Sequence, residues 1–344
     1  MVDLLDLDSY DYYLPQELIA QYPLKDRSSS RLMHIDRKTG TIYHLYFRDL
    51  VDLLNPGEVL VINNSKVIPA RLYGYKDNGT KIEVLLLNHL EGSKWKCMVH
   101  PGKRLKREQV LWFSSQLEGL ISLPDEDGLR VIEFNNPDTY WKEIECIGHT
   151  PLPPYIKRVD EAEDRQTYQT VYAKEPGSVA APTAGFHFTE EMLSQLQEKG
   201  IQIVNIILHI GMGTFVPIKT PRIDQHKMHS EFCTILEETA NVINKAKLEG
   251  RRVIAVGSTS IRTLESFWEN GSLMSGSKWT DIFIYPGKKI QVADALITNF
   301  HLPKSTLLMM ISAFAGYELT RKAYEIAVQE RYRFFSFGDA MYIS

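Results

Sequence analysis

Apolar runs alternate with helical patterns along most of the chain after residue 177. Helices are expected from Glu190 to Gly200 and around residues 238–248, 260–268, 305–315 and 320–331. Apolar strands are expected at residues 57–65, 201–210, 253–256, 282–285 and 295–298. Uninterrupted apolar strands between helices indicate a parallel or mixed sheet that is covered on both faces.

The segment from about residue 71 to residue 134 has a different pattern of short β-rich runs separated by turn signals. Asn78-Gly79 and Asp127-Gly128 lie between alternating apolar runs, and such pairs favour tight hairpins because glycine accepts a positive φ. The pattern predicts a small antiparallel β-barrel, closed or nearly closed. The predicted fold is therefore an α/β core, with a mixed or parallel sheet or a distorted β/α-barrel, formed by residues 1–65 and 150–344. The β-barrel at 66–149 is inserted into it.

Composition narrows the class of protein. The 344 residues are 44% hydrophobic and carry a formal net charge of −4, so any contact with nucleic acid must come from local basic patches. Three widely separated cysteines fit a reducing cytoplasm and argue against structural zinc. The acidic N-terminus does not resemble a signal peptide, and a run of about 18 apolar residues is lacking. We expect a soluble cytoplasmic protein without a membrane partner.

Residues 181–189, with the sequence APTAGFHFT, are the most distinctive segment. Thr189 is placed to cap a helix whose first turn contains Glu190 and Glu191, where carboxylates suit the helix dipole. His187 lies between two phenylalanines just before this helix. The segment fits either a turn that handles a ligand or a buried turn with a core histidine.

Other turns after predicted strands carry similar residues. Ligands of α/β proteins gather at the carboxyl ends of strands, and glycines let a ligand approach the backbone closely. We expect these turns to converge on one rim, where helix starts favour anions. The turns contain Gly211, Gly213 and Thr214; Gly257, Ser258 and Thr259; Pro286 and Gly287; and Asn299 and His301.

Several chemistries remain open at this rim. The turn at residues 257–260 lacks the lysine of a P-loop. His226, His229 and Glu231 could form half of a metal site, or Glu231 or His229 could act as a general acid or base. One alternative is a metal-dependent hydrolase that uses His187, His209, His226 and His229. The other is a non-catalytic RNA-binding protein whose barrel is the binding module.

Basic residues cluster in the predicted barrel. Six cations without an intervening acid surround Trp95, which indicates a surface for phosphate contacts or a solvated β-face. A second cluster, at residues 331–335, combines Arg331 and Arg333 with aromatic rings, and a third covers residues 27–31. The six cations are Lys94, Lys96, Lys103, Arg104, Lys106 and Arg107.

The long motifs together resemble the S-adenosylmethionine:tRNA ribosyltransferase-isomerase family of queuosine biosynthesis. The matching segments span nearly the whole chain and include YDYYLPQELIAQYPLKDRSSSRLM, VLVINNSKVIPARL, PLPPYIKR, GSVAAPTAGFHFTEEML, LHIGMGTFVPI, HKMHSE, AVGSTSIRTLES, TDIFIYPG and DALITNFHLPKSTLLMMISAFAG. The resemblance implies an α/β core with an inserted β-barrel, in agreement with the pattern of strands and helices.

The resemblance also implies the reaction. The ribosyl part of S-adenosylmethionine is transferred and isomerised onto 7-aminomethyl-7-deazaguanine at the tRNA wobble position, which gives epoxyqueuosine-tRNA, adenine and methionine. S-adenosylmethionine is a co-substrate, no metal is expected, and the chain is expected to act as a monomer.

Roles for individual residues follow as hypotheses from the resemblance and from positions after strands. Glu231 is the first candidate for the proton-abstracting base, and His187 or His229 for assisting adenine departure. Arg262 is assigned to the methionine carboxylate, and Asn299 with His301 to the deazaguanine base. The cofactor-binding turns are Gly211, Gly213, Thr214, Gly257, Ser258 and Thr259, and the tRNA contacts are Lys103, Arg104, Lys106, Arg107, Arg331 and Arg333.

Overall fold

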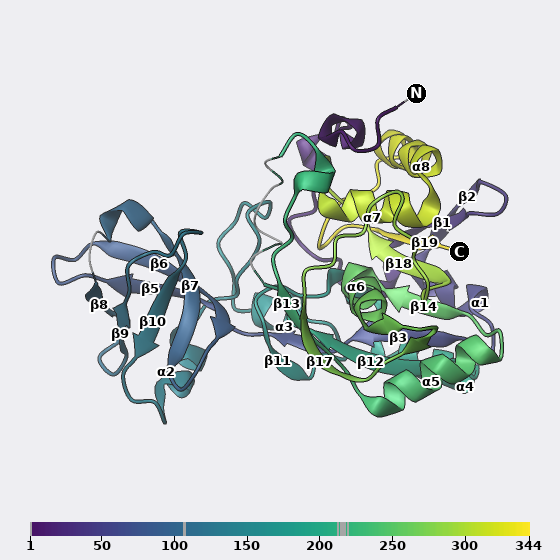
Figure 1. Cartoon of the computed structure of the whole chain (residues 1–344). Helices are drawn as coiled ribbons and strands as arrows, with labels where there is room; N and C mark the ends of the chain where they lie inside the picture. The colour runs from purple at the N-terminus through teal and green to yellow at the C-terminus, as the bar shows by residue number, and fades with distance from the viewer. Residues whose placement is uncertain (1, 106–107, 212, 214–217, 219) are drawn as a thin grey trace.

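The computed structural model describes residues 2–105, 108–211, 213, 218 and 220–344. Two large β-sheet structures dominate the fold. The larger is a nine-stranded mixed sheet with helices, the second is a closed six-stranded antiparallel barrel that stands to one side of it (Figure 1), and two further sheets have only two strands each. The predicted combination of an α/β core with a small β-barrel is confirmed. The core sheet is open, with β17 and β2 at its edges, so the mixed-sheet form of the prediction holds and the β/α-barrel form does not.

The centre of the core sheet is parallel. Strands β12, β3, β14 and β18 run in one direction, while β13 is antiparallel to β12 and to β17. At the other side β19 is antiparallel to β18, and β1 is parallel to β19 and antiparallel to β2. The order is β17 (Gly276–Thr280), β13 (Glu231–Ile235), β12 (Gln202–Leu208), β3 (Val59–Asn63), β14 (Val253–Val256), β18 (Ala295–Asn299), β19 (Ala340–Ile343), β1 (Arg31–Asp36) and β2 (Thr41–Tyr46).

Both faces of the central strands are buried, as their continuous apolar sequences predict. Alternate residues of β3 point to opposite faces, so Val59 and Val61 belong to one core cluster and Leu60 and Ile62 to another. The first face packs against α5 (Glu237–Leu248), α6 (Gly257–Phe267), α7 (Thr306–Ala315) and α8 (Tyr317–Gln329). The second face packs against α1 (Leu50–Leu53) and α4 (Glu190–Glu198).

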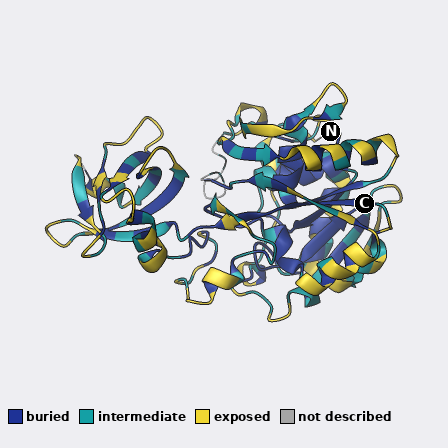
Figure 2. Ribbon diagram, turned by 90° about the horizontal axis from the view of Figure 1, so that it is seen from below, coloured by how far each residue is buried: buried dark blue, intermediate teal, exposed yellow. Residues whose placement is uncertain are grey.

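The barrel has its own apolar core, and Figure 2 shows buried residues both there and in the core sheet. Gly79 and Gly128 adopt φ angles of 76° and 80°, which confirms the predicted glycine turns. Helix α2 (Tyr140–Ile147) follows the last strand. The strands close in the order β10 (Arg130–Phe134), β7 (Lys94–His100), β6 (Lys81–His89), β5 (Arg71–Tyr75), β8 (Gln109–Trp112) and β9 (Glu118–Ile121).

A short two-stranded parallel sheet, β4 (Ser65–Val67) with β11 (Glu175–Ser178), lies where the chain leaves and re-enters the core. Between α2 and β11 the returning chain forms the short helix α3 (Asp164–Thr167). Arg71 and His149 form a β-bridge at the root of the barrel. We propose that residues 66–149 form one domain and residues 1–65 with 150–344 the other.

The strand predicted at residues 282–285 is wrong. The edge strand β17 lies just before it and pairs with β13, whereas residues 282–285 have left the sheet. Ile282, Phe283 and Ile284 are apolar because they line a cavity. A small hairpin, β15 (Trp268–Glu269) with β16 (Ser272–Leu273), precedes β17. Among the described residues, none of the helices combines the length and apolarity needed to cross a membrane.

Candidate active site

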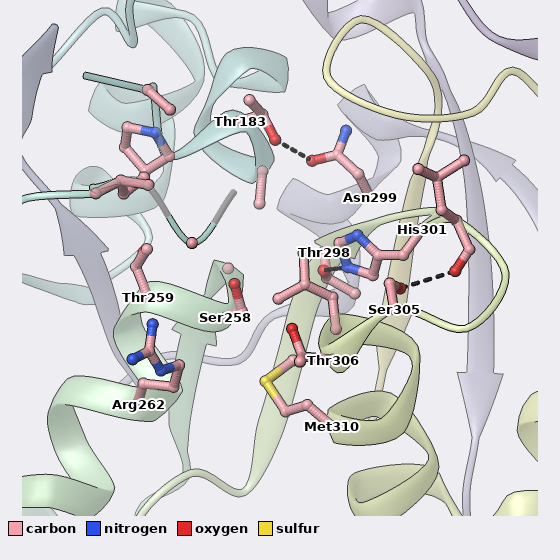
Figure 3. Close-up of a pocket in the computed structure, with 18 of the residues that line it drawn as sticks. Thr183, Ser258, Thr259, Arg262, Thr298, Asn299, His301, Ser305, Thr306 and Met310 are labelled. Carbon is pink, nitrogen blue, oxygen red and sulfur yellow. Dashed lines mark hydrogen bonds between the residues drawn. The ribbon is translucent and has the colours of Figure 1, made fainter. Parts of the chain in front are cut away.

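A cavity of 490 Å³ lies at the carboxyl ends of the parallel strands (Figure 3). Turns after β14 and β18 line it, together with Glu231 at the start of the antiparallel strand β13. The predicted turns at residues 211–214, 257–259 and 299–301 each contribute described residues to this cavity, whereas Pro286 and Gly287 do not line it, because the strand predicted before them has left the sheet. The predicted residues that line the cavity are Gly213, His229, Glu231, Gly257, Ser258, Thr259, Arg262, Asn299 and His301.

A buried ion pair is the main charged feature of the cavity. Arg262 and Glu231 are only 9% and 4% exposed, and Arg262 Nη1 donates to Glu231 Oε2. The second carboxylate oxygen, Oε1, accepts the Gly211 amide at 3.0 Å. Both oxygens of Glu231 thus already have a donor, which stabilises its charged form, while each oxygen keeps a second lone pair that could accept a proton.

Unused hydrogen-bonding capacity lies beside this pair. Arg262 Nη2 and the Thr259 hydroxyl are buried and have no hydrogen-bond partner in the described part of the chain. Gly257, at the start of α6, has a φ of 83° that favours glycine. The α6 N-terminus has no side-chain cap, so its first amides add to an environment that suits an anionic ligand group.

The turn after β18 supplies neutral polar groups. His301 is buried and its Nε2 lies 3.0 Å from Thr298 Oγ1. The Tyr324 hydroxyl accepts the His301 amide at 3.0 Å, and Ser305 caps α7 by accepting the Leu308 amide. His301 is uncharged near neutral pH, since burial lowers its pKa to about 3, while the charged Lys304 of the same turn lines the cavity and pairs with Asp8 and Asp11.

His187 lies behind the cavity wall, and the large cavity is not lined by it. It belongs to the 3₁₀-helix η6 (Thr183–His187) and contacts Ser30 and Asn299 through its two ring nitrogens, at 2.7 and 3.0 Å. Burial, with smaller effects from Arg27 and Arg333, lowers its pKa to about 3. Assistance to adenine departure by His187 stays a prediction, and it would have to be indirect.

The two neutral histidines predict acid sensitivity. An unfolded histidine binds a proton with a pKa near 6.5, whereas His187 and His301 do so only near pH 3 in the folded chain. Their contribution to the free energy of unfolding is complete above about pH 6.5. It falls by about 1.4 kcal/mol per pH unit per histidine as the pH drops toward 3, because the unfolded state then binds more protons.

Urea unfolding of His187→Gln and His301→Gln at several pH values measures this effect. We expect each substitution to destabilise most near neutral pH and progressively less in acid, since the variant no longer has the group that protonates on unfolding. His89→Gln, which removes an exposed histidine, is the control. A pH-independent cost of the two buried substitutions would contradict the expectation.

Some predicted residues lie away from the cavity or outside the described part of the chain. The Gly211 amide reaches Glu231, but the cavity lining does not include Gly211, and Thr214 is outside the described residues. His226 packs edge-on against Phe283. Among the described side chains, no group of three or more His, Cys, Asp and Glu residues could hold a metal.

The predicted nucleic-acid contacts fall into different environments. Lys103 and Arg104 are exposed on the barrel, while Lys106 and Arg107 lie outside the described residues. Arg331 is exposed, with Glu17 at 4.0 Å. Arg333 is only partly exposed and donates from Nη2 to the Tyr22 carbonyl at 2.6 Å.

Trp95 does not present its ring to a ligand, contrary to its expected place in the basic patch. It is 5% exposed and stacks on Trp141 of helix α2. The exposed barrel aromatics are Tyr75 and Trp112, which pair across neighbouring strands and are 45% and 47% exposed. Alternation along the strands could have identified them, because the even positions of β8 and the odd positions of β5 face outward.

Two aromatic residues line the cavity although the sequence did not predict them there, and one of them, Phe335, belongs to the predicted cluster at residues 331–335. Tyr155 and Phe335 both line it, with ring centroids 4.2 Å apart, and Tyr155 is fixed by a 2.7 Å hydrogen bond to Ser336. They lie 180 positions apart in sequence, so periodicity carries no signal for their contact. Flat apolar rings beside polar groups suit a purine-like base.

An open α/β sheet whose strand ends enclose such a polar, aromatic-lined cavity defines an α/β enzyme, here with an added β-barrel. The particular family follows from comparison with known proteins. Residues 7–343 match the family described as Queuosine biosynthesis protein, and the chain belongs to this family.

Named relatives agree over the full length. The S-adenosylmethionine:tRNA ribosyltransferase-isomerase of Clostridium kluyveri is 51% identical over 342 residues, covering 98% of this chain and 100% of the relative. The protein of the same name from Carboxydothermus hydrogenoformans is 51% identical over 340 residues with the same coverage. The crystal structure of S-adenosylmethionine tRNA ribosyltransferase from Thermotoga maritima is 39% identical and has a TM-score of 0.58, covering 98% of this chain and all of the other. These relatives fit neither the metal-dependent hydrolase nor the non-catalytic RNA-binding alternative.

Proposed function

We propose that this chain is an S-adenosylmethionine:tRNA ribosyltransferase-isomerase. It transfers and isomerises the ribosyl part of S-adenosylmethionine onto 7-aminomethyl-7-deazaguanine at the tRNA wobble position. The products are epoxyqueuosine-tRNA, adenine and methionine. The observation that carries the proposal is full-length identity of 51% to two enzymes of this name, and the cavity contains groups suited to a carboxylate, to an aromatic base and to removal of a proton.

The chemistry explains which groups the enzyme needs. A sulfonium acidifies the adjacent ribose protons, so a base can remove one and adenine can leave as the sugar opens. The substrate amine then adds to the activated carbon, and a sugar oxygen displaces methionine to close the epoxide. These steps require a base, a means of stabilising departing adenine and groups that orient a cationic co-substrate.

Arg262 is the proposed partner of the methionine carboxylate. Its Nη2 and the Thr259 hydroxyl have unused donor capacity, and the nearby start of α6 adds backbone amides. A guanidinium matches the geometry of a carboxylate and forms charge-assisted hydrogen bonds with it. Tyr155 and Phe335 offer apolar surface to a base elsewhere in the same cavity.

Glu231 remains the first candidate for the base and His229 the second. Both line the cavity, and the carboxylate of Glu231 would be released for proton transfer if the methionine carboxylate drew Arg262 toward itself. In this arrangement co-substrate binding would activate the base. His229 lies next to Gly213 and could reach the substrate without breaking an ion pair.

The defining experiment measures adenine release from S-adenosylmethionine by the purified chain. We expect release only with tRNA that carries 7-aminomethyl-7-deazaguanine, and not with the same tRNA carrying guanine. Activity is expected to persist after chelation, because no step of this reaction requires a metal. Release without the modified base, or loss of activity on chelation, would contradict the proposal.

The barrel is the proposed tRNA-binding surface. Lys103 and Arg104 are exposed, and no described carboxylate forms an ion pair with them, whereas Lys94 and Lys96 lie 3.8 and 3.1 Å from Glu133 and Asp125. The exposed ring of Trp112 adds a stacking surface. The cytoplasm is the proposed compartment, because the substrate is tRNA and none of the three cysteines forms a disulfide.

Reversing the charge of Lys103 and Arg104 to glutamate tests this surface. We expect tRNA affinity to fall about tenfold or more at low salt. The slope of log affinity against log salt concentration should become shallower by the equivalent of about 1–2 phosphate contacts. The control reverses Lys245 and Lys322, which are exposed on the core helices α5 and α8, and changes the net charge equally. Equal losses in the two double variants would show that only net charge matters.

A further inference from the structure

A chain of hydrogen bonds runs from the 3₁₀-helix η3 (Arg27–Ser29) to the cavity wall and ends at Thr183. It passes from the Arg27 carbonyl through Ser30, His187 and Asn299. Figure 3 shows its last step, between Thr183 and Asn299, on a different side of the cavity from Arg262. The direction in which each hydrogen bond is donated can be worked out from groups that only accept.

The orientation of the Asn299 amide is determined by a backbone carbonyl. Asn299 Nδ2 lies 3.2 Å from the Phe335 carbonyl oxygen and 3.0 Å from His187 Nε2. A carbonyl only accepts hydrogen bonds, so the amide nitrogen must face it. Both N–H groups of Asn299 are then used, one toward Phe335 and one toward His187, and Asn299 presents only its oxygen elsewhere.

The protonation of His187 follows from this orientation. Its Nε2 accepts from Asn299, so it carries no proton, and Nδ1–H must donate to Ser30 Oγ at 2.7 Å. Ser30 in turn donates to the Arg27 carbonyl at 3.2 Å. The lowered pKa of His187, which burial causes, agrees with a neutral ring that has one donor and one acceptor.

Thr183 completes the chain at the cavity. Its hydroxyl lies 3.1 Å from Asn299 Oδ1, an atom that only accepts, so Thr183 donates its single proton to Asn299. The remaining lone pairs of Thr183 Oγ1 and Asn299 Oδ1 are all that these two cavity-lining residues offer to a ligand. We name these two atoms the acceptor pair.

We propose that Thr183 is a specificity-determining residue that accepts a hydrogen bond from an N–H group of a substrate base, and that His187 is the positioning residue that sets this polarity. The inference rests on the proposed function for the identity of the ligand. Two bases share the required chemistry, because adenine of S-adenosylmethionine and the deazaguanine of the tRNA both carry an exocyclic amine. A carbonyl at the same place would face two acceptors and be repelled.

Binding measurements with Thr183→Val test the acceptor role, since valine has the same shape without the hydroxyl. We expect affinity for S-adenosylmethionine to fall about tenfold, while affinity for its analogue with hydrogen in place of the adenine amino group is unchanged. If the tRNA base is the partner instead, the loss appears with modified RNA and disappears when its 2-amino group is removed. Thr183→Ser keeps the hydroxyl and should retain wild-type affinities.

Variants of His187 test the positioning role. His187→Leu removes the acceptor for Asn299, so we expect it to lose the same discrimination as Thr183→Val, with no further loss in the double variant. His187→Gln can place an oxygen near the Nε2 position and should restore discrimination without altering the pH profile of binding. A merely structural role would lower the affinity of all ligands alike and would add to the Thr183→Val effect.

The outcomes separate this inference from the proposed function. Suppose that the wild-type chain releases adenine and that Thr183→Val prefers each amine-bearing ligand over its hydrogen analogue by the same factor as wild type. The acceptor role of Thr183 is then wrong and the proposed function stands. If wild type does not release adenine, the function fails, while discrimination between the amine and its hydrogen analogue still reports on Thr183. If a stably folded His187→Leu variant still distinguished the amine-bearing ligand from its hydrogen analogue as well as wild type does, the positioning role of His187 would be wrong.

Discussion

Replacing Glu231 by glutamine is expected to reduce adenine release at saturating substrates by about 10²–10⁴-fold, because the side chain can no longer accept a proton. The amide fills the same volume beside Arg262 and Gly211. One of its ends must nevertheless turn an N–H toward a donor, so the free energy of unfolding should also fall by about 1–3 kcal/mol. Single-turnover adenine release and urea unfolding measure the two effects separately.

A matched control exists outside the cavity. Glu58 is 5% exposed and pairs with Arg252 at 2.6 Å, so Glu58→Gln also neutralises a buried carboxylate of an ion pair. We expect it to lose stability but keep turnover. Wild-type turnover in Glu231→Gln would show that Glu231 is not the base, and His229→Gln would then be expected to abolish the reaction.

Replacing Arg262 by methionine is expected to weaken S-adenosylmethionine binding and the fold together. Loss of a charge-assisted hydrogen bond to the methionine carboxylate costs about 1.5–3 kcal/mol, which is about 10–100-fold in affinity. The same substitution leaves Glu231 buried without its cation, which should lower the free energy of unfolding by about 3–5 kcal/mol. Calorimetric binding and urea unfolding measure the two losses.

A second substitution separates these effects. Adding Glu231→Gln to Arg262→Met removes the uncompensated charge and should recover part of the stability without recovering affinity. Arg252→Met, which breaks the Glu58 pair away from the cavity, should destabilise the fold and leave affinity unchanged. If Arg262→Met binds S-adenosylmethionine as wild type does, Arg262 serves only to hold Glu231.

Local pattern was sufficient for the four parallel strands at the centre of the core sheet and for its longer helices, but it missed the strands β1, β2, β13, β17 and β19. Thr189 accepts the Met192 amide at 3.1 Å and caps α4, as predicted, and β14 covers residues 253–256 as expected. Helix α6 begins at Gly257 rather than at Ser260, whose hydroxyl instead donates to the Val256 carbonyl. The apolar residues at 282–285 led to the wrong prediction of a strand, because a cavity wall and a buried strand require similar apolar side chains.

The residues of the site also fall into two groups, those that the sequence could predict and those that required the tertiary structure. Residues that follow strands could be found from sequence, since parallel strands bring their carboxyl ends to one edge. Glu231 and Arg262 are 31 positions apart and their pairing is a tertiary contact, as is the contact of Tyr155 with Phe335. No periodicity connects such positions, so sequence could name the members of the site but not their partners.

The sequence by itself determined the α/β core, the β-barrel and, through its long motifs, the family. The periodicity of apolar residues and the glycines of turns determine local secondary structure. The long motifs identify which residues are present, but they do not show which residues contact one another. Only the tertiary structure decided that His187 stands behind the wall as a neutral ring, that Trp95 is buried, and that Thr183 and Asn299 face the cavity as acceptors. Burial and the direction of a hydrogen bond depend on neighbours brought together from distant parts of the chain, and those neighbours exist only once the chain has folded.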